Sequence, residues 1–352
     1  MLSDLFADAV ARPASDGGIP GIAAAAGRGE TVLKTWTAGL ADTTPGGSRP
    51  MTAGTLFDLA SLTKVVSTTT LVLGLAGSGA LDLDAPAARY LPAVPWEAVT
   101  VRQLLAHTSG LPSAVTFYQT CSSRAELLDA LFETPLEAPP GTRVAYSDLG
   151  FMTLGEVVSR VSGLSLDAAF RSLVAGPLGL GSAGYRPSGP PSRFAATERR
   201  GDGTPWTGIV HDENARVMDG VAGHAGLFAP VADLARWASW WVSSSGTVVP
   251  AALRRSAESC QTGGLPGDGG LPGRRGLGWV LAGDRYDSLT GAWPATSVSH
   301  NGFTGTSLAL DSASGAWFVL LTNRVHYGRA ETAGSIKSLR RAAHTEAARL
   351  LF

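Results

Sequence analysis

The sequence predicts an α+β protein in which both ends of the chain build one antiparallel sheet, with a helical lobe inserted between them. Apolar segments at residues 21–27 and 31–40 are joined by a short polar link, which is typical of a β-hairpin. Beyond Ser61, strand-like segments return only after residue 276. Between these regions the apolar spacing is largely helical. Hydrophobic residues make up 44% of the 352 residues, so a large core can be buried.

The N-terminal region is predicted to begin with a helix and to continue as strands. Apolar residues recur at helical spacing over residues 2–11, and Pro13 ends that helix. The hairpin follows. A short strand predicted at residues 55–59 then leads directly to Ser61.

The middle of the chain is predicted to be helical, with Gly, Pro or Ser bounding each segment. Helices are expected at residues 65–76, 101–107, 124–132, 149–161 and 166–174. A further helix opens at Pro230 and carries Trp237, Trp240 and Trp241. We expect these tryptophans in the core, because large rings bury much apolar area.

The C-terminal third returns to strands. Residues 261–276 are rich in Gly and Pro and are expected to form a mobile surface loop. After them come predicted strands at residues 277–281, 296–300, 306–311 and 316–323, and an amphipathic helix at 336–351.

These elements predict two lobes. The sheet lobe would comprise residues 1–60 and 230–352, and the helical lobe residues 61–229. The active site is expected at their junction, because substrates usually bind in clefts.

Charge and composition argue against several classes of partner. The 28 basic and 29 acidic residues give a formal net charge of −1, with no run of one sign, so neither nucleic acid nor an anionic membrane is indicated. No secretory signal and no membrane span are visible, so we expect a cytoplasmic protein, or a periplasmic or secreted one if the native N-terminus was trimmed. Cys121 and Cys260 are expected to be free thiols, with a disulfide as the alternative. The oligomeric state is left open.

The stretch at residues 57–64, FDLASLTK, contains the first chemical motif. Ser61 and Lys64 are three residues apart, so a helix beginning at Ser61 would place hydroxyl and amine on one face. A lysine can activate a serine once burial or a neighbouring cation lowers the lysine pKa. Backbone N–H groups at the helix start would face an oxyanion. The same spacing also fits an ordinary helix start with a solvated lysine.

Two further short motifs lie at element boundaries. Tyr-x-Asp at Tyr146 precedes a predicted helix, where Ser147 or Asp148 could simply act as the cap and the tyrosine could belong to the core. His-Asn-Gly at His300 ends a predicted strand, where Asn-Gly usually forms a tight turn and a lone histidine is usually structural.

With these three motifs in this order, the chain resembles the serine beta-lactamase and penicillin-binding-protein superfamily, in particular class C beta-lactamases, R61-type DD-peptidases and related esterases. Residues 103–111 (QLLAHTSGL) and 223–228 (GHAGLF) also look like stretches common in this branch. The resemblance covers nearly the whole chain. It implies a beta-lactamase/transpeptidase-like fold and a cofactor-free serine hydrolase that cleaves an ester, amide or peptide carbonyl of a small acyl substrate through an acyl-serine intermediate.

The resemblance also implies catalytic roles. Ser61 would attack the carbonyl and become acylated, while Lys64 helps to take its proton. Tyr146 would act as general base, pass a proton to the leaving group and later activate the deacylating water. Nearby cations must favour the phenolate, and Lys64 and His300 are the candidates.

The remaining site residues follow from the same resemblance. The backbone N–H groups of Ser61 and Phe303 would form the oxyanion hole. Asn301 and Gly302 would border the substrate.

Two members of the expected catalytic set depart from the beta-lactamase pattern. Asp148 stands where those enzymes carry Asn, and it mostly accepts hydrogen bonds. His300 stands where many carry Lys, as it does in R61-type DD-peptidases, and it is expected to titrate near neutrality. Both changes are expected to weaken recognition of an anionic beta-lactam. The alternatives are a true beta-lactamase, a DD-carboxypeptidase, or a non-catalytic binding protein on the same scaffold.

A separate polar cluster is formed by His211, Asp212 and Glu213. Adjacent residues in a loop seldom converge on one metal ion, so no metal site is predicted. Loop scaffolding and a role in the substrate cleft are the other interpretations. His107 and His224 are expected to be structural.

Overall fold

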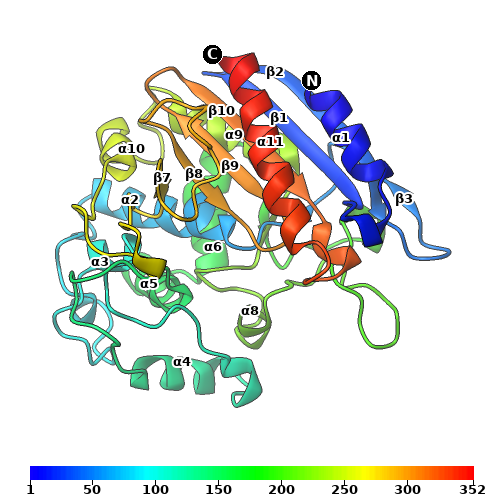
Figure 1. Ribbon diagram of the computed structural model, residues 1–352. Coiled ribbons are helices and arrows are strands. Elements are labelled where there is room, and N and C mark those ends of the chain that lie inside the picture. The colour runs from blue at the N-terminus through cyan, green and yellow to red at the C-terminus, as the bar shows by residue number, and fades with distance from the viewer.

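A seven-stranded antiparallel sheet joins the two ends of the chain (Figure 1). The computed structural model describes the backbone of residues 1–352 and every side chain except that of Asp268. In spatial order the strands are β3 (Arg49–Pro50), β2 (Thr31–Asp42), β1 (Gly21–Arg28), β10 (Ala316–Thr322), β9 (Ser307–Asp311), β8 (Val298–Asn301) and β7 (Val280–Leu281). The central pair β1 and β10 brings N-terminal and C-terminal segments together, which confirms the predicted α+β sheet.

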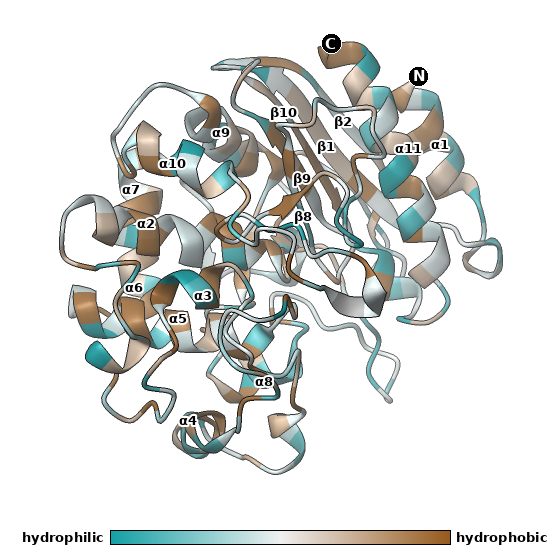
Figure 2. Ribbon diagram, turned by 60° about the vertical axis from the view of Figure 1, so that its left-hand side comes forward, coloured by the Kyte–Doolittle hydropathy of each residue, from teal (hydrophilic) through white to brown (hydrophobic). Residues whose placement is uncertain are grey.

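Both faces of the sheet are covered by helices. In β1, Ala23 and Ala25 face the core that contains α9 (Val231–Val242), whereas Ala24 and Ala26 face the core that contains α1 (Leu2–Ala11) and α11 (Ala333–Leu351). Figure 1 shows α11 crossing in front of β1 and β10. Side chains alternate between faces along a strand, so a strand covered on both sides is apolar throughout. Figure 2 accordingly shows mostly hydrophobic residues on β9 and β10.

Helices form near the five positions predicted between the two sheet segments. They are α2 (Thr70–Gly77), α3 (Val101–Leu105), α4 (Arg124–Glu133), α5 (Asp148–Ser162) and α6 (Leu166–Phe170). Two short helices, α7 (Gly176–Leu178) and α8 (Glu213–Val217), were not predicted. The helix α9 buries Trp237, Trp240 and Trp241, as expected. A further helix, α10 (Ala251–Glu258), follows it. The division into a sheet lobe and a helical lobe stays a prediction.

A second, three-stranded sheet was not predicted. Its order is β4 (Phe57–Asp58), β6 (Leu227–Ala229) and β5 (Gly184–Tyr185). The strand β4 lies within the short strand predicted at residues 55–59, whereas β5 and β6 are only two and three residues long, which is too short for an alternating pattern to reveal. This sheet fixes the segment that runs into Ser61.

The region before β8 differs from the prediction. The strand expected at residues 277–281 shortens to β7, because Gly278 adopts a φ of +78° and turns the backbone. The segment at residues 261–276 was predicted to be a surface loop, and it is exposed around Leu271. However, the side chain of Arg275, near the end of this loop, is only 1% exposed. The end of this loop therefore belongs to the interior.

Two further expectations concern the whole chain. Among the described residues, no helix combines the length and apolar character needed to cross a membrane. Cys121 is buried and Cys260 is exposed, and both are free thiols, as expected.

Candidate active site

Ser61 lies in a tight turn between β4 and the following helix. The preceding residue, Ala60, has a φ of +46°, an uncommon conformation for a residue with a side chain. Ordinary helical geometry begins at residue 62, and Lys64–Thr69 forms a π-helical segment before α2. The sequence prediction of an α-helix starting at Ser61 is therefore only approximately right. Such π-helical turns are frequent at functional sites.

A buried carboxylate, Asp58, holds this turn in place. It accepts hydrogen bonds from the backbone N–H of Ala60 (2.8 Å) and of His211 (2.6 Å). Its backbone carbonyl accepts a third, from the Thr304 hydroxyl (2.8 Å). Asp58 thus connects the turn at Ser61 to two distant segments. Burial raises the pKa of Asp58 to about 6, although these backbone hydrogen bonds oppose the shift.

Substituting Asp58→Asn is expected to change how stability depends on pH. Between its ordinary pKa of 3.8 and the folded value of about 6, the folded protein keeps a proton that the unfolded chain has released. The unfolding free energy contributed by this group therefore falls as pH rises through that window, by about 3 kcal/mol. Urea denaturation across this range should show the fall in wild type but not in D58N. Asp129→Asn, at an exposed site, is the control. Equal pH slopes for wild type and D58N would contradict the account.

Lys64 is a buried cation in contact with Ser61. Its Nζ donates to the Ser61 Oγ at 3.1 Å and lies 2.7 Å from the Asp148 Oδ1. The side chain of Lys64 is fully buried. Burial alone would lower the lysine pKa, but Asp148 and Tyr146 outweigh it and raise the pKa above its ordinary value. This raised pKa favours the protonated form of Lys64, and the expected part of Lys64 in taking the serine proton stays a prediction.

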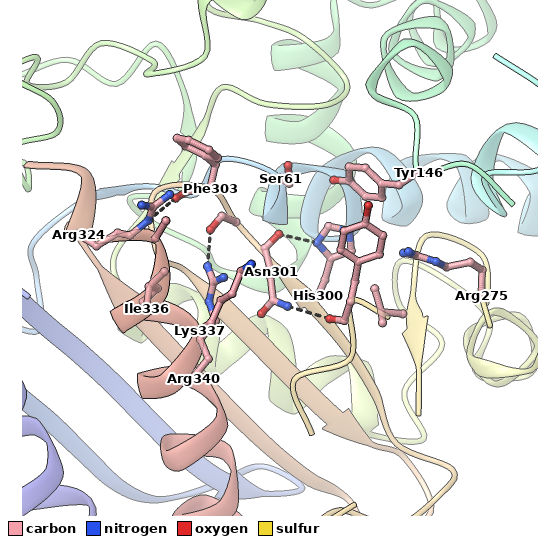
Figure 3. Close-up of a pocket in the computed structure, with 14 residues that line it drawn as sticks. Ser61, Tyr146, Arg275, His300, Asn301, Phe303, Arg324, Ile336, Lys337 and Arg340 are labelled. Carbon is pink, nitrogen blue, oxygen red and sulfur yellow. Dashed lines mark hydrogen bonds between the residues drawn. The ribbon is translucent and has the colours of Figure 1, made fainter. Parts of the chain in front are cut away.

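Tyr146 projects into the same space from the segment before α5. In Figure 3 its hydroxyl points toward Ser61. The Lys64 Nζ lies 5.0 Å from the centre of the tyrosine ring, and the His107 ring lies 4.6 Å away. The Nδ1 of His107 also accepts the backbone N–H of Ser147 at 3.0 Å, which fixes the segment that carries Tyr146. His107 therefore has the structural role that was expected.

His300 lies at the end of β8 beside Tyr146, with ring centres 6.0 Å apart. Its side chain is buried. Burial, followed by the positive charges of Lys64 and Arg275, holds the pKa of His300 well below its ordinary value. The ring is neutral at neutral pH, so the expectation that it supplies a second, titrating cation is wrong.

The turn after β8 lies against the turn at Ser61. The Thr306 hydroxyl donates to the Leu59 carbonyl at 2.9 Å. A Cβ at Gly302 would come within 2.5 Å of that same carbonyl, so the close approach requires glycine. Within the described part of the chain, the backbone N–H groups of Ser61 and Phe303 make no hydrogen bond. Both remain available to an oxyanion.

The expected substrate-binding residue Asn301 is held by polar neighbours. Its amide group donates to the Ser288 hydroxyl (2.8 Å) and accepts from the Ser307 hydroxyl (2.9 Å). These contacts leave little rotational freedom to the Asn301 side chain.

A cavity of about 310 Å³ opens at Ser61 (Figure 3). It is lined by Ser61, Tyr146, Arg275, Val280, Tyr286, His300, Asn301, Gly302, Phe303, Arg324, Ala333, Ile336, Lys337 and Arg340. Four of these residues are cationic, and this lining contains no Asp or Glu. No sequence motif marked these cations, because a basic residue on an amphipathic helix or in a loop is usually only solvated.

Two of the four cations donate hydrogen bonds to backbone carbonyls of the turn after β8. Arg340 donates to the carbonyls of Gly302 and Thr306, and Arg324 donates to the Phe303 carbonyl at 2.9 Å. Lys337 is exposed and forms no ion pair with any described residue. Its ammonium group is the one best placed to meet a ligand.

The cluster at residues 211–213 disperses to separate partners. The His211 ring stacks on Phe303, with centres 5.7 Å apart, at the border of the cavity. Asp212 caps α8 and lies 2.9 Å from the Nε2 of His224. Glu213 pairs with Arg329. Among the described side chains, no group of three metal ligands converges.

Comparisons with known proteins agree with this geometry. The family model named Beta-lactamase matches residues 3–340. An Escherichia coli (strain K12) protein named "Putative D-alanyl-D-alanine carboxypeptidase" is 31% identical over 310 residues, covering 78% of this chain and 70% of that protein. The N-acetylmuramyl-L-alanine amidase of Bacillus subtilis (strain 168) is also 31% identical over 310 residues, with 78% and 69% covered. The solved structure of EstCE1, "a hydrolase with promiscuous acyltransferase activity", has the same fold, with a TM-score of 0.75, 21% identity and 98% of both chains covered.

Proposed function

Because this chain belongs to the beta-lactamase family and is a serine hydrolase of ester, amide or peptide bonds, we propose that Ser61 is its nucleophile and that its substrate carries a carboxylate near the scissile carbonyl. The role of Ser61 as nucleophile is supported by one observation: the Lys64 Nζ contacts both the Ser61 Oγ and the Asp148 carboxylate. The second part is supported by the cationic lining of the cavity.

In the proposed reaction Tyr146 is the general base. The Ser61 Oγ attacks the carbonyl carbon while its proton passes to the Tyr146 phenolate. The backbone N–H groups of Ser61 and Phe303 bind the resulting oxyanion. Tyr146 then gives the proton to the departing alcohol or amine, which leaves an acyl group on Ser61. Water attacks this ester, again with Tyr146 as base, and the proton returns to Ser61.

Lys64 acts in this scheme as a fixed cation. Because Asp148 holds it at 2.7 Å and raises its pKa, Lys64 remains protonated throughout the cycle. Its ammonium group lies 5.0 Å from the centre of the Tyr146 ring, where its positive charge attracts negative charge that develops during the proton transfers. Asp148, which replaces the amide of the beta-lactamase pattern, is thus proposed to fix the charge state of Lys64 and not to contact substrate.

The cavity lining argues for an anionic substrate. The sequence alone suggested weaker recognition of an anionic beta-lactam, because Asp148 and His300 replace the Asn and Lys of the beta-lactamase pattern. However, Lys337 and Arg340 from α11 and Arg275 from the loop before β7 bring positive charge to the same cavity. The Escherichia coli relative is named as a D-alanyl-D-alanine carboxypeptidase, and the substrate of a carboxypeptidase ends in a carboxylate. The cavity is also lined by apolar side chains such as Phe303 and Ile336, against which an apolar acyl group would pack.

Substitution of Lys337 tests the proposed charge preference. We expect wild type to hydrolyse a p-nitrophenyl ester that ends in a carboxylate with a lower KM than the matching ester that ends in a carboxamide. Lys337→Gln should raise KM for the carboxylate roughly two- to fivefold, as suits an exposed ion pair, with kcat unchanged. Lys34→Gln, on the distant strand β2, is the control. If wild type shows no preference between the two esters, an anionic substrate is ruled out.

A further inference from the structure

The turn after β8 carries one of the two backbone donors that are proposed to bind the oxyanion. This turn closes on itself, because the Gly302 N–H donates to the Thr306 carbonyl at 2.8 Å and the Gly305 N–H donates to the Gly302 carbonyl at 3.0 Å. These two bonds define the shape of the turn. Both move with it, so they do not fix its orientation relative to Ser61.

Two hydroxyl groups attach the turn to the segment before Ser61. The Thr304 hydroxyl donates to the Asp58 carbonyl at 2.8 Å, and the Thr306 hydroxyl donates to the Leu59 carbonyl at 2.9 Å. Both contacts lie on one side of the turn. A second contact, on the other side, is needed to stop the turn from tilting.

Arg340 of α11 makes that second contact. Its Nη2 donates to the Gly302 carbonyl and, at 2.8 Å, to the Thr306 carbonyl, so one nitrogen spans the two ends of the turn. In Figure 3, Arg340 reaches the turn from α11, on the side away from Ser61. The turn is thus held between α11 and the segment before Ser61.

The peptide between Gly302 and Phe303 links Arg340 to the expected oxyanion donor. This peptide is trans, so its C=O and N–H point in opposite directions within one plane. A guanidinium that binds the Gly302 carbonyl from α11 therefore directs the Phe303 N–H away from α11. That N–H donates to no described group, and Phe303 lines the same cavity as Ser61.

The charge of Arg340 has no acidic partner. Arg340 is half-buried, it forms no ion pair with any described residue, and its Nε is buried without an acceptor among them. A cation in such a place is costly for stability, which calls for a compensating role. Hydrogen bonds in a chain polarise one another, so a cation on the Gly302 carbonyl also makes the Phe303 N–H a stronger donor.

We propose that Arg340 is a positioning residue for the oxyanion hole, which orients and polarises the peptide between Gly302 and Phe303 so that its N–H meets the oxyanion formed at Ser61. The proposal rests on the proposed function, because it requires an oxyanion at Ser61. Arg340 acts through the backbone and makes no bond to the reacting atoms. Its role is distinct from binding a substrate carboxylate, which a neutral substrate lacks.

The test compares p-nitrophenyl acetate with its thiono analogue, in which sulfur replaces the carbonyl oxygen. Both are neutral, and sulfur is a weak hydrogen-bond acceptor that gains little from an oxyanion hole. The ratio of their kcat/KM values therefore measures how far the reaction depends on the oxyanion donors. We expect wild type to favour the oxygen ester strongly. Arg340→Met should lower kcat/KM for that ester roughly 10- to 100-fold and for the thiono ester far less, so the ratio should fall.

Two further variants accompany this measurement, and the unfolding midpoint is recorded for each. Arg341→Met removes the next, exposed cation of α11, so it is the matched control and should keep the wild-type ratio. Arg340→Lys keeps the charge on a shorter side chain and should lower the ratio by a smaller factor than R340M.

The ratio separates a positioning role from a merely structural one. Partial unfolding would reduce the activity toward both esters equally, so a wild-type ratio in R340M would overturn the inference. If R340M does not fold, a wild-type ratio in R340K has the same meaning. Should wild type itself react equally with both esters, the proposed oxyanion hole fails and this inference fails with it. A wild-type preference that R340M retains refutes only the role of Arg340.

Discussion

Replacing Ser61 with alanine is expected to lower kcat for ester hydrolysis by roughly 10⁴- to 10⁶-fold. The substitution removes the only atom that can form the acyl bond in the proposed reaction. The cation Lys64 would keep its contacts with Asp148 and with the His224 carbonyl (3.1 Å), so the surrounding site should stay intact. The residual rate would reflect substrate binding and the two backbone N–H groups alone.

The measurement is the steady-state rate of p-nitrophenyl ester hydrolysis, with the unfolding midpoint recorded for each variant. Ser78→Ala, at the exposed end of the same helical region, is the matched control and should behave as wild type. A fold-competent S61A that turns over the ester within tenfold of wild type would exclude Ser61 as the nucleophile.

Tyr146→Phe is expected to have the second largest effect, a loss of about 10²- to 10⁴-fold in kcat. Phenylalanine keeps the ring that packs on His107 and lies beside Lys64 and Arg275, so only the hydroxyl is lost. Because proton transfer is needed in the transition state and not for binding, KM should change little.

Pre-steady-state product release distinguishes the steps in which Tyr146 takes part. Both acylation and deacylation should slow in the variant, since the phenol is proposed to serve each of them. Tyr118→Phe, at an exposed site, is the control. A variant that loses affinity while keeping kcat would show that Tyr146 binds substrate and is not the base.

Much of the fold could be predicted because its pattern is local. The hairpin before residue 42 and the helix α5 follow from short-range periodicity and from turn residues at their ends. The three-stranded sheet around β6 could not be found in this way, since its strands are too short to carry a pattern. The positive φ of Gly278 shortens β7. The residues around Gly278 still have a strand-like pattern, so the sequence did not indicate this turn.

In the candidate site, too, the features with a local sequence pattern could be predicted and those set by distant packing could not. Short motifs located Ser61, Lys64 and Tyr146, and the structure brings these three together. Arg275 and Lys337 were missed, because nothing in their neighbours distinguishes a cation that faces a cavity from one that faces water. Their place in the site is set by distant packing of α11 and of the loop before β7.

Charge states were the least predictable feature. A lowered pKa was considered for Lys64 as a base, and His300 was expected to titrate near neutrality. The carboxylate of Asp148 instead outweighs the burial of Lys64 and raises its pKa, whereas burial, followed by the charges of Lys64 and Arg275, lowers the pKa of His300. The sign of each shift depends on which partner the fold supplies.

The central claim is that a covalent acyl group forms on Ser61 during turnover. The most direct measurement is mass spectrometry of enzyme quenched in acid while it hydrolyses a p-nitrophenyl ester, followed by peptide mapping. The account predicts an added mass equal to the acyl group on the peptide that contains Ser61, and none on Ser61→Ala. An enzyme that turns over the ester with the acyl group on another residue would contradict it.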